Sequence, residues 1–559
     1  MHGCHGGREG NPAVIEDLWY KNSVIYSLDL ETFMDANEDG VGDIEGMMRR
    51  LDYLDSLGID TVWLAPFQPT PNKDNGYDIS DFYGVDPRHG SSGDFVELIH
   101  QAAKRGIRVI MDLVVNHTSD QHRWFQEARR DKDSPYRDWY VWSKKRPPGW
   151  NQGMVFPGVQ KSTWTRDPVA GEYYFHRFYD FQPDLNMDNP QVRTEVRRII
   201  GYWLQMGVAG FRVDAVPFIL ETPGDPKLKF EYLTEMREFL QWRRGDAVLL
   251  GEANVLPKDT KPYFGDADNG MHLMFNFFVN QHLFYALASA DVRPLMEALR
   301  ATRNIPANAQ WAHFLRNHDE LDLGRLTDEQ RAQVFARFAP EKDMQLYNRG
   351  IRRRLAPMLG NRQQIELAYS MLFSLPGTPV IRYGDEIGMG DLLTLPERQS
   401  VRTPMQWSKE PQAGFSLSEK LVHPMIEEGP YSCKRVNVEA QRRDPHSLLN
   451  WTASMIRLKK ECPEIGWGAW KVLPTGSPNL LALRYDWRGN ALVTIHNFDD
   501  KPLEARIKSG VDGEKLVNLF VQDESEADKS GTHRIALEGY GYRWYRVGGL
   551  NHILRRERR

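Results

Sequence analysis

Residues 109–117 read VIMDLVVNH, an apolar β-branched run that ends in polar side chains. Similar runs recur along the chain between amphipathic stretches, and this alternation is typical of repeated βα units. The predicted strands are 24–27, 61–64, 109–114, 211–213, 248–250, 273–275, 311–314 and 380–381. Eight strands with intervening helices over about 400 residues predict an α/β fold, a (β/α)8 TIM barrel.

Two helices of this barrel can be located from the sequence. Apolar residues recur at helical intervals after the first strand and predict one helix with a single buried face: Ile44, Met47, Met48, Leu51 and Leu54. A second helix is expected over 95–105, with Ser92 and Asp94 before it as candidate N-caps.

Two insertions and a terminal unit depart from the barrel pattern. About 95 residues rich in Trp, Tyr and Phe separate the third and fourth strands, far more than a crossover helix needs. A charged segment near 328–356 is expected to add a helical insertion, and turn signals after residue 466 predict an antiparallel β domain. The predicted units are a flexible N-terminus (1–18), the first part of the barrel (19–117), an inserted domain (118–185), the rest of the barrel (186–465) and the C-terminal β domain (466–559).

The composition narrows the class of protein. The 559 residues are 41% hydrophobic and 26% charged, which excludes a disordered or fibrous chain. The formal net charge of −5 does not suggest a nucleic-acid or membrane partner and is compatible with a small neutral substrate. Three cysteines make no disulfide framework. With no signal-peptide pattern and no long apolar run, the chain is expected to be cytoplasmic, and a homo-oligomer is possible.

Polar clusters follow directly on the predicted barrel strands, at the face where such barrels carry their chemistry. The clusters comprise Asp112, Asn116, His117, Arg212, Asp214, Glu252, Asn317, His318 and Asp319. Any one of them would be unremarkable as a helix cap, but together on one face they predict an active site.

Asp214 and Glu252 leave adjacent strands, which lie about 4.8 Å apart in a sheet. Their carboxyl groups are therefore expected to approach the separation of roughly 5 to 5.5 Å found in retaining glycosidases. Arg212, two residues before Asp214, is expected to keep that carboxylate ionised with a low pKa. Glu252 has no cation beside it in the sequence and is the better candidate for a protonated general acid. Asp319 is a candidate for gripping substrate hydroxyls.

These segments resemble a known family. DLVVNHT (112–118), GFRVDAV (210–216), GEAN (251–254) and FLRNHDE (314–320) resemble the four signature regions of the α-amylase superfamily, glycoside hydrolase family 13. The resemblance implies that Asp214 is the nucleophile, Glu252 the acid/base and Asp319 the transition-state stabiliser. It also implies that the first glucosyl subsite is lined by Tyr77, Asp78, His117, Arg212 and His318, and that the aromatic insertion and terminal unit are the family's domains B and C.

Further stretches narrow the resemblance within this superfamily. QPDLN (182–186) resembles the marker of the oligo-1,6-glucosidase and trehalose synthase branch, and NAQWAHFLRNHDEL, GIRRRLAPML and VRTPMQW are similar to trehalose synthases. The resemblance implies an intramolecular transglucosylase that interconverts maltose and trehalose, with Arg402 reaching the mouth of the active site. A surface ion pair is the alternative for Arg402. Pro396, Glu397 and Gln399 stand where such enzymes usually carry Gly-Asp-Arg-Asn.

Because this loop lies near the acceptor side, the ratio of hydrolysis to isomerisation stays open. The rival activities on the same scaffold are an α-glucosidase or oligo-1,6-glucosidase type of hydrolase and a sucrose isomerase. A non-catalytic interaction protein is the rival of another class, but it would be expected to have lost the carboxylates and to carry a membrane span.

One loop has the spacing of a cation site. Asp35, Asn37, Asp39, the Val41 carbonyl and Asp43 present alternating oxygens, like the start of an EF-hand loop, and suit Ca²⁺ or Mg²⁺. The twelfth position is a glycine rather than the usual glutamate, and a metal-free turn rich in Asp and Asn is the alternative.

The family resemblance favours Ca²⁺ at this loop. It also implies a second Ca²⁺ site between the barrel and the inserted domain, formed by Asn116, Asp184 and Glu221 with the carbonyls of Phe218 and Ile219. The alternative for Asn116 is a hydrogen-bonding role among its neighbours.

Overall fold

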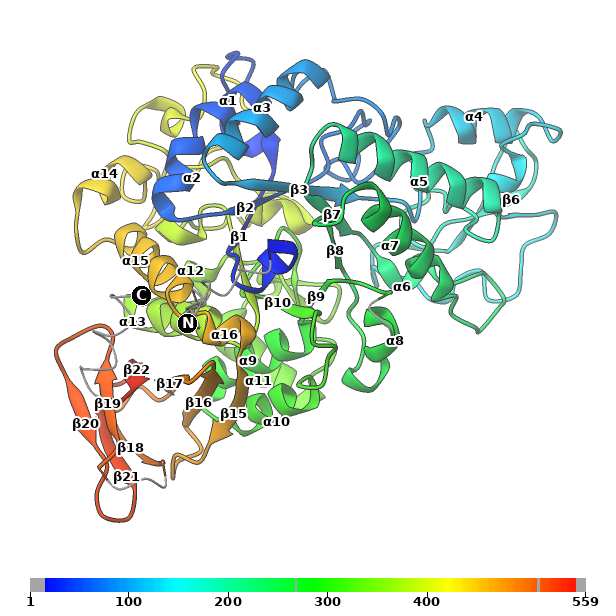
Figure 1. Ribbon diagram of the computed structural model, residues 1–559. Helices are drawn as coiled ribbons and strands as arrows, with labels where there is room; N and C mark the ends of the chain where they lie inside the picture. The colour runs from blue at the N-terminus through cyan, green and yellow to red at the C-terminus, as the bar shows by residue number, and fades with distance from the viewer. Residues whose placement is uncertain (1–15, 267–268, 510–512, 549–559) are drawn as a thin grey trace, which may run out of the picture.

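The centre of the molecule is a closed barrel of eight parallel strands in the order β1-β14-β10-β9-β8-β7-β3-β2 (Figure 1). This computed structural model describes residues 16–266, 269–509 and 513–548, so most of the predicted N-terminal unit 1–18 lies outside the described residues. The strands are β1 (Ile25–Leu28), β2 (Thr61–Leu64), β3 (Arg108–Leu113), β7 (Gly210–Val213), β8 (Val248–Gly251), β9 (Leu273–Phe275), β10 (Gln310–Phe314) and β14 (Thr378–Arg382). The predicted barrel is confirmed, and each predicted strand begins and ends within two residues of the observed one.

Side chains alternate along each strand between the barrel interior and the shell of helices. In β3, Ile110 belongs to the apolar cluster inside the barrel, whereas Val109 and Met111 belong to the larger cluster outside it. The same alternation points Asp112 inward at the carboxyl end of the strand. The outer shell contains α3 (Ser92–Lys104), α5 (Pro190–Gln205), α7 (Glu231–Arg243), α9 (Phe277–Ser289), α10 (Arg293–Ala301), α13 (Arg362–Ser374) and α15 (Leu448–Lys460).

The two predicted helices differ in detail from expectation. The first is broken into α1 (Ile44–Arg49) and α2 (Leu51–Leu57), because Arg50 leaves helical geometry at φ −109° and ψ 5°. The guanidinium of Arg50 lies 4.2 Å from the ring of Trp407. The second helix, α3, begins three residues earlier than predicted. Ser91 is its N-cap and Asp94 closes a capping box, so the prediction of Ser92 as the cap was wrong.

The aromatic insertion after β3 forms a unit that projects from the side of the barrel (Figure 1). It contains α4 (Arg123–Arg130) and a small antiparallel sheet of β4 (Trp142–Ser143), β6 (Tyr173–Phe175) and β5 (Trp164–Arg166). Edge-on ring contacts such as Trp124 to Trp139, with centroids 4.7 Å apart, build its core. A β-bridge between His117 and Asp184 holds its two ends together.

The insertion between β10 and β14 is only partly helical, which corrects the prediction. Its first part is α11 (Asp328–Phe338), but it continues into β12 (Gln345–Leu346) and β13 (Gly350–Ile351). β13 pairs with β12 on one side and with β11 (Leu321–Asp322) on the other. Tyr347 and Asn348, at φ 54° and 59°, make the tight turn between β12 and β13.

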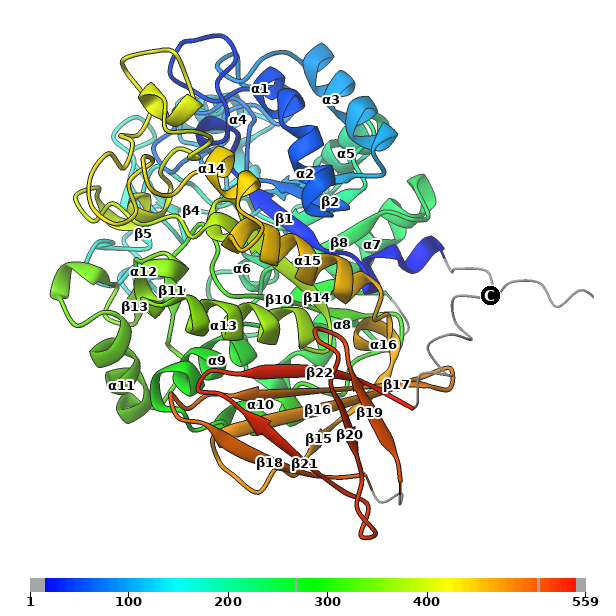
Figure 2. The same cartoon turned by 90° about the vertical axis from the view of Figure 1, so that its left-hand side faces the viewer.

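The C-terminal unit is antiparallel, as predicted. A six-stranded sheet contains β15 (Ala469–Leu473), β16 (Leu480–Trp487), β17 (Asn490–Asn497), β22 (Tyr542–Val547), β19 (Lys515–Asn518) and β20 (Glu524–Glu526), and β18 (Leu503–Lys508) pairs with β21 (Thr532–Leu537). Figure 2 shows these strands below α13 and α16 (Glu464–Trp467). A buried ion pair at 2.5 Å between Arg546 and Glu464 joins the sheet to α16.

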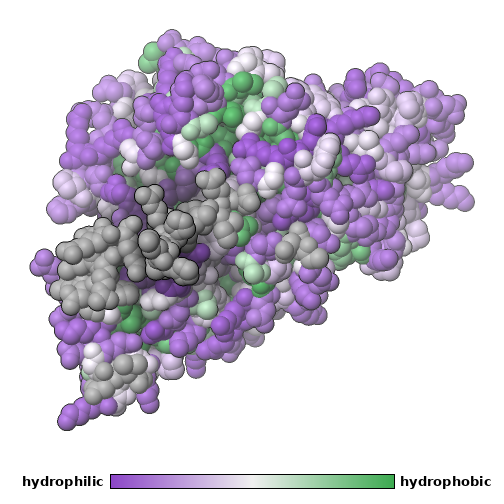
Figure 3. Space-filling model, in the orientation of Figure 1, coloured by the Kyte–Doolittle hydropathy of each residue, from purple (hydrophilic) through white to green (hydrophobic). Residues whose placement is uncertain are grey.

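The surface is mainly hydrophilic in the view of Figure 3, with small dispersed hydrophobic areas. Among the described residues no helix has the length and apolarity needed to cross a bilayer.

Candidate active site

Arg212 lies at the centre of a cluster of three carboxylates. Its Nη1 lies 2.5 Å from Oδ1 of Asp112 and 2.7 Å from Oδ1 of Asp214, and its Nη2 lies 2.8 Å from Oε2 of Glu252. The Arg212 side chain is buried. Asp112 ends the interior face of β3, while Asp214 and Glu252 each follow one residue after β7 and β8. The structure therefore brings together the two carboxylates predicted to be catalytic.

Burial decides the protonation of this pair. Loss of solvent raises the pKa of Asp214 to about 6 and that of Glu252 to about 7, although Arg212 opposes both shifts. The expectation that Asp214 has a low pKa was therefore wrong, because burial of its carboxyl group outweighs a single guanidinium that three carboxylates share. Glu252 has no cation beside it in the sequence, but in the structure Arg212 contacts it from the neighbouring strand. The predicted order of the two pKa values holds: the pKa of Glu252 is higher than that of Asp214, as a general acid requires.

Asp319 lies between two arginines of one loop. Nη1 of Arg398 and Nη2 of Arg402 lie 2.8 Å and 3.0 Å from its Oδ1. Burial alone would raise the pKa of Asp319, but His318 and these arginines bring it well below the ordinary range. Arg402 is only 2% exposed, and its Nε donates to the carbonyl of His318, which excludes a surface ion pair.

A layer of rings closes the base of the site. The rings of Tyr77 and His318 stack at 5.3 Å, with 2.8 Å between the tyrosine oxygen and Nε2 of His318. Nε2 of His117 lies 3.0 Å from the carbonyl of Tyr77. Burial lowers the pKa of His117 to about 4 and that of His318 to about 3, so both imidazoles are neutral near pH 7 and are suited to hydrogen bonding with sugar hydroxyls.

Asp78 occupies a different place from the one expected. Its carboxylate accepts hydrogen bonds from the amides of Lys73 and Asp74 and from the hydroxyl of Thr70, so it organises its own loop. Asp74, which the sequence reasoning missed, lines the cavity instead. Its Oδ1 lies 2.8 Å from Nη2 of Arg398, which was missed as well.

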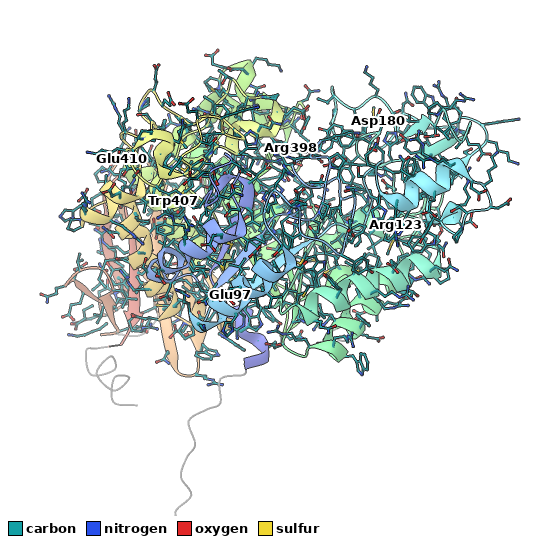
Figure 4. All side chains as sticks on the ribbon, turned by 90° about the horizontal axis from the view of Figure 1, so that it is seen from above. Glu97, Arg123, Asp180, Arg398, Trp407 and Glu410 are labelled. Carbon is teal, nitrogen blue, oxygen red and sulfur yellow. The ribbon has the colours of Figure 1, made fainter. Side chains whose placement is uncertain are left out.

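The signals for the missed residues were weak. Asp74 lies three residues before Tyr77, and Arg398 lies inside the loop whose neighbouring positions depart from the family pattern. In the view of Figure 4, Arg398 lies between Trp407 and Asp180, and Asp180 belongs to the aromatic insertion.

The carboxylates open onto a cavity of about 650 Å³. Both insertions contribute to its wall: residues 153–156 and Phe178 come from the aromatic insertion, and Arg349 comes from the turn after β12. Two of the lining residues contact Asp322: Nδ2 of Asn254 donates to its Oδ2, and Nε of Arg349 lies 3.3 Å from the same oxygen. The volume is in the range of about 300 to 1,000 Å³ that is usual for small-molecule sites.

The donors of the first candidate metal loop are all oxygens, which fits Ca²⁺. The carboxylate of Asp35 accepts hydrogen bonds from the amides of Glu38 and Gly40 at 2.8 Å, and that of Asp43 accepts from Ala36 at 3.0 Å. These two carboxylates organise the loop, while Asp39 is exposed. Within the described ranges no three Asp, Glu, His or Cys side chains are grouped as a metal site, and Ca²⁺ here stays a prediction.

At the second candidate metal site, one of the expected ligands, Glu221, forms an ion pair with a guanidinium. Nη2 of Arg177 lies 2.5 Å from Oε2 of Glu221, and the amide of Arg177 donates to Asp184 at 2.8 Å. Burial raises the pKa of Asp184 to about 7, which favours a protonated and therefore weaker ligand. The structure brings these residues together around Arg177, and metal binding there also stays a prediction.

Comparisons with known proteins match this architecture. A family model described as "Alpha amylase, catalytic domain" matches residues 28–468, and one described as "Sucrose hydrolase-like, C-terminal domain" matches residues 489–546. A trehalose synthase of Thermus thermophilus is 42% identical over 97% of this chain, and the chain spans 56% of that protein's length. A trehalose synthase/amylase of Mycolicibacterium smegmatis is 41% identical, covering 95% of this chain and 92% of that protein.

Solved structures agree with the fold. An α-amylase from H. orenii has a TM-score of 0.77 at 27% identity, covering 94% of this chain and 100% of that one. A trehalulose synthase from Pseudomonas mesoacidophila has a TM-score of 0.75 at 26% identity, covering 95% of this chain and 99% of that one. With the family model covering most of the barrel, this chain belongs to the α-amylase family.

Proposed function

We propose that this protein is a retaining intramolecular transglucosylase that interconverts maltose and trehalose. The observation that carries the proposal is the placement of Asp214 and Glu252 on one guanidinium at the base of a cavity with walls from both insertions. The similarity to trehalose synthases over nearly the whole chain supports this substrate pair.

The first displacement divides the work between the two carboxylates. The carboxylate of Asp214 attacks the anomeric carbon of the non-reducing glucosyl unit of maltose, and the bond from that carbon to the bridging oxygen breaks. Glu252 gives its proton to the departing oxygen. The products are a β-glucosyl ester on Asp214 and one molecule of glucose, with Glu252 now ionised.

The second displacement reverses these roles on the retained glucose. Its anomeric hydroxyl attacks the anomeric carbon of the ester and gives its proton to Glu252, while the carboxylate of Asp214 leaves. Two inversions retain the α configuration and form the α,α-1,1 linkage of trehalose. Because Glu252 ends protonated and Asp214 ends as a free carboxylate, as both began, the cycle consumes no cofactor and can run in either direction.

The remaining residues hold the sugar and the developing charge. Asp319, kept ionised by Arg398 and Arg402, is suited to accept hydrogen bonds from sugar hydroxyls. Neutral His117 and His318 add hydrogen bonds without adding positive charge beside an oxocarbenium-like transition state.

We also propose that the 35–43 loop binds Ca²⁺ as a structural ion, held by Asp35, Asn37, Asp39, the Val41 carbonyl and Asp43. It would neutralise the acidic side chains of this loop and takes no part in the displacement steps. A cytoplasmic location completes the proposal, and a content of three cysteines in 559 residues suits a reducing compartment.

The second candidate is a hydrolase of α-glucosides or a sucrose isomerase. The observation that favours it is the 396–399 loop, which departs from the trehalose synthase pattern beside Asp319. The similarity to a trehalulose synthase and to an oligo-1,6-glucosidase of Parageobacillus thermoglucosidasius, 31% identical over 95% of this chain, also points to this group.

A product analysis separates the two. Purified protein is incubated with maltose and the sugars are resolved over time. Trehalose that rises to a plateau, and maltose that returns when trehalose is supplied, is the expected result. Glucose as the sole product, or turnover of sucrose or isomaltose without turnover of maltose, would overturn the proposal in favour of the second candidate.

A further inference from the structure

Behind the cavity wall, one carboxylate joins both insertions to the loop that carries Arg398. Oε2 of Glu397 accepts hydrogen bonds from the hydroxyls of Tyr179 at 2.9 Å and Tyr347 at 2.8 Å. Tyr179 belongs to the aromatic insertion, and Tyr347 lies in the turn between β12 and β13. We call these three residues the latch. Hydrogen bonds to an ionised acceptor are stronger than neutral ones, so the latch is a firm connection between separate segments.

Two members of the latch have strained backbones. Glu397 has a φ of 41° and Tyr347 a φ of 54°, in the left-handed region that bulky residues rarely adopt. Such strain persists where surrounding contacts enforce it, and it gathers at functional sites. Here the two strained residues are hydrogen-bonded to each other, which places the strain at the junction of the loop and the insertion.

An aromatic stack transmits the position of the latch to the cavity. The ring of Phe156 contacts the rings of both Tyr179 and Tyr347, with centroid distances of 4.8 Å and 5.0 Å. The guanidinium of Arg398 lies 4.9 Å from the Phe156 centroid. Phe156 and Arg398 line the cavity.

Arg398 follows Glu397 in the chain and binds both Asp319 and Asp74. A shift of Glu397 therefore displaces the arginine that holds the catalytic Asp319.

We propose that Glu397 is a positioning residue that holds the two insertions closed over the acceptor glucose, and so sets how often the glucosyl ester is captured by that glucose rather than by water. With the latch closed, the anomeric hydroxyl of the retained glucose attacks the ester and its proton passes to Glu252. With the latch open, a water molecule attacks the same carbon, its proton passes to Glu252, and free glucose results. The inference rests on the proposed function and concerns a residue at which this chain departs from the usual family pattern.

Three variants test the latch. Glu397→Ala removes the shared acceptor, while Tyr179→Phe and Tyr347→Phe each remove one donor and keep the ring. Each protein is incubated with maltose and isotopically labelled free glucose. The measurements are the ratio of glucose to trehalose produced and the label incorporated into trehalose. Loss of a hydrogen bond to a charged group is expected to raise the glucose share by roughly tenfold in Glu397→Ala and less in the two tyrosine variants.

Label incorporation is the readout that a merely structural role would not change. Retained glucose never mixes with the medium, so the wild-type protein is expected to place little label in trehalose, and the variants more. Tyr83→Phe is the matched control, because its hydroxyl donates to Glu195 at 2.8 Å away from the residues that line the cavity.

The outcomes separate the inference from the proposed function. Latch variants that match wild-type protein in product ratio and label would overturn the inference, and so would an equal effect of Tyr83→Phe. A wild-type protein that forms no trehalose would overturn the proposed function instead. In that case α-glucosyl fluoride serves as donor and added glucose as acceptor. The latch variants are then expected to shift products toward hydrolysis, and an unchanged partition overturns the inference.

Discussion

Nη2 of Arg212 lies 2.8 Å from Oε2 of Glu252, so the proposed general acid contacts the same guanidinium as Asp214, the proposed nucleophile. The proposed mechanism requires an ionised Asp214, whose pKa is about 6, and a protonated Glu252, whose pKa is about 7. We expect kcat/KM to follow a narrow bell, falling below about pH 6 and above about pH 7, with apparent values that belong to the coupled pair. Initial rates on maltose across this range provide the measurement. A plateau that extends two units above pH 7 would contradict the assignment of Glu252 as the acid.

Asp214→Asn is expected to lower kcat on maltose by roughly four orders of magnitude, because the amide does not form the glucosyl ester. The same change is expected to raise Tm at pH 7. The pKa of Asp214 is raised on folding, so its ionisation penalises the native state progressively from about pH 4 to about pH 6 and fully above that range. Calorimetry of both proteins at pH 7 and pH 4 measures the difference, which should shrink at the lower pH. Undiminished turnover would sink the nucleophile assignment.

Arg398→Lys is expected to lower kcat/KM on maltose by roughly 100-fold, since a lysine does not bridge Asp319 and Asp74 as a guanidinium does. Arg105→Lys is the matched control, because Arg105 pairs with Asp52 on the surface. A rate for Arg398→Lys close to that of the control would show that Arg402 alone suffices to hold Asp319.

Asp74→Asn and Asp78→Asn are expected to differ in kind. Asp74 lines the cavity and binds Arg398, so its variant should lose activity while keeping most of its stability. The carboxylate of Asp78 accepts hydrogen bonds from amides of its own loop. Asp78→Asn should therefore lower Tm more than Asp74→Asn does. Steady-state kinetics and thermal unfolding on the same samples make the comparison. The reverse pattern would restore Asp78 as the sugar ligand.

Removal of Ca²⁺ by EDTA is expected to lower Tm, because a cation that binds the 35–43 loop of the folded protein, and not the unfolded chain, stabilises the folded state. Asp39→Asn removes one charge at an exposed position of the loop and is expected to weaken the effect of EDTA. Asp35 and Asp43 are left intact in this test, since they organise the loop by accepting backbone amides. An identical Tm with EDTA and with excess Ca²⁺ would favour the metal-free turn.

The barrel could be predicted because its strands are marked locally. Each is a short apolar run, and a polar cluster at its end shows which face carries the chemistry. The positions of Asp214, Glu252 and Asp319 followed from this arrangement. Their pKa values did not, because spacing reveals a neighbouring cation such as Arg212 but does not reveal burial or how many carboxylates share that cation.

Residues that meet across long stretches of chain were beyond such reasoning. Arg398 and Asp74 are 324 positions apart and are joined only by the closure of the barrel. The turn at Tyr347 was missed for another reason. A tyrosine with positive φ contradicts the turn preferences from which a hairpin is predicted, and the charged residues around it favour a helix.

The two insertions that wall the cavity are expected to affect the rate of the proposed reaction as well as its products. If maltose enters and trehalose leaves between them, their contacts have to separate and form again in each cycle. Such movements often take longer than bond exchange at the anomeric carbon. If this opening limits turnover, the rate should fall in a viscous medium, and a variant with weaker contacts between the insertions should turn over faster but release more glucose.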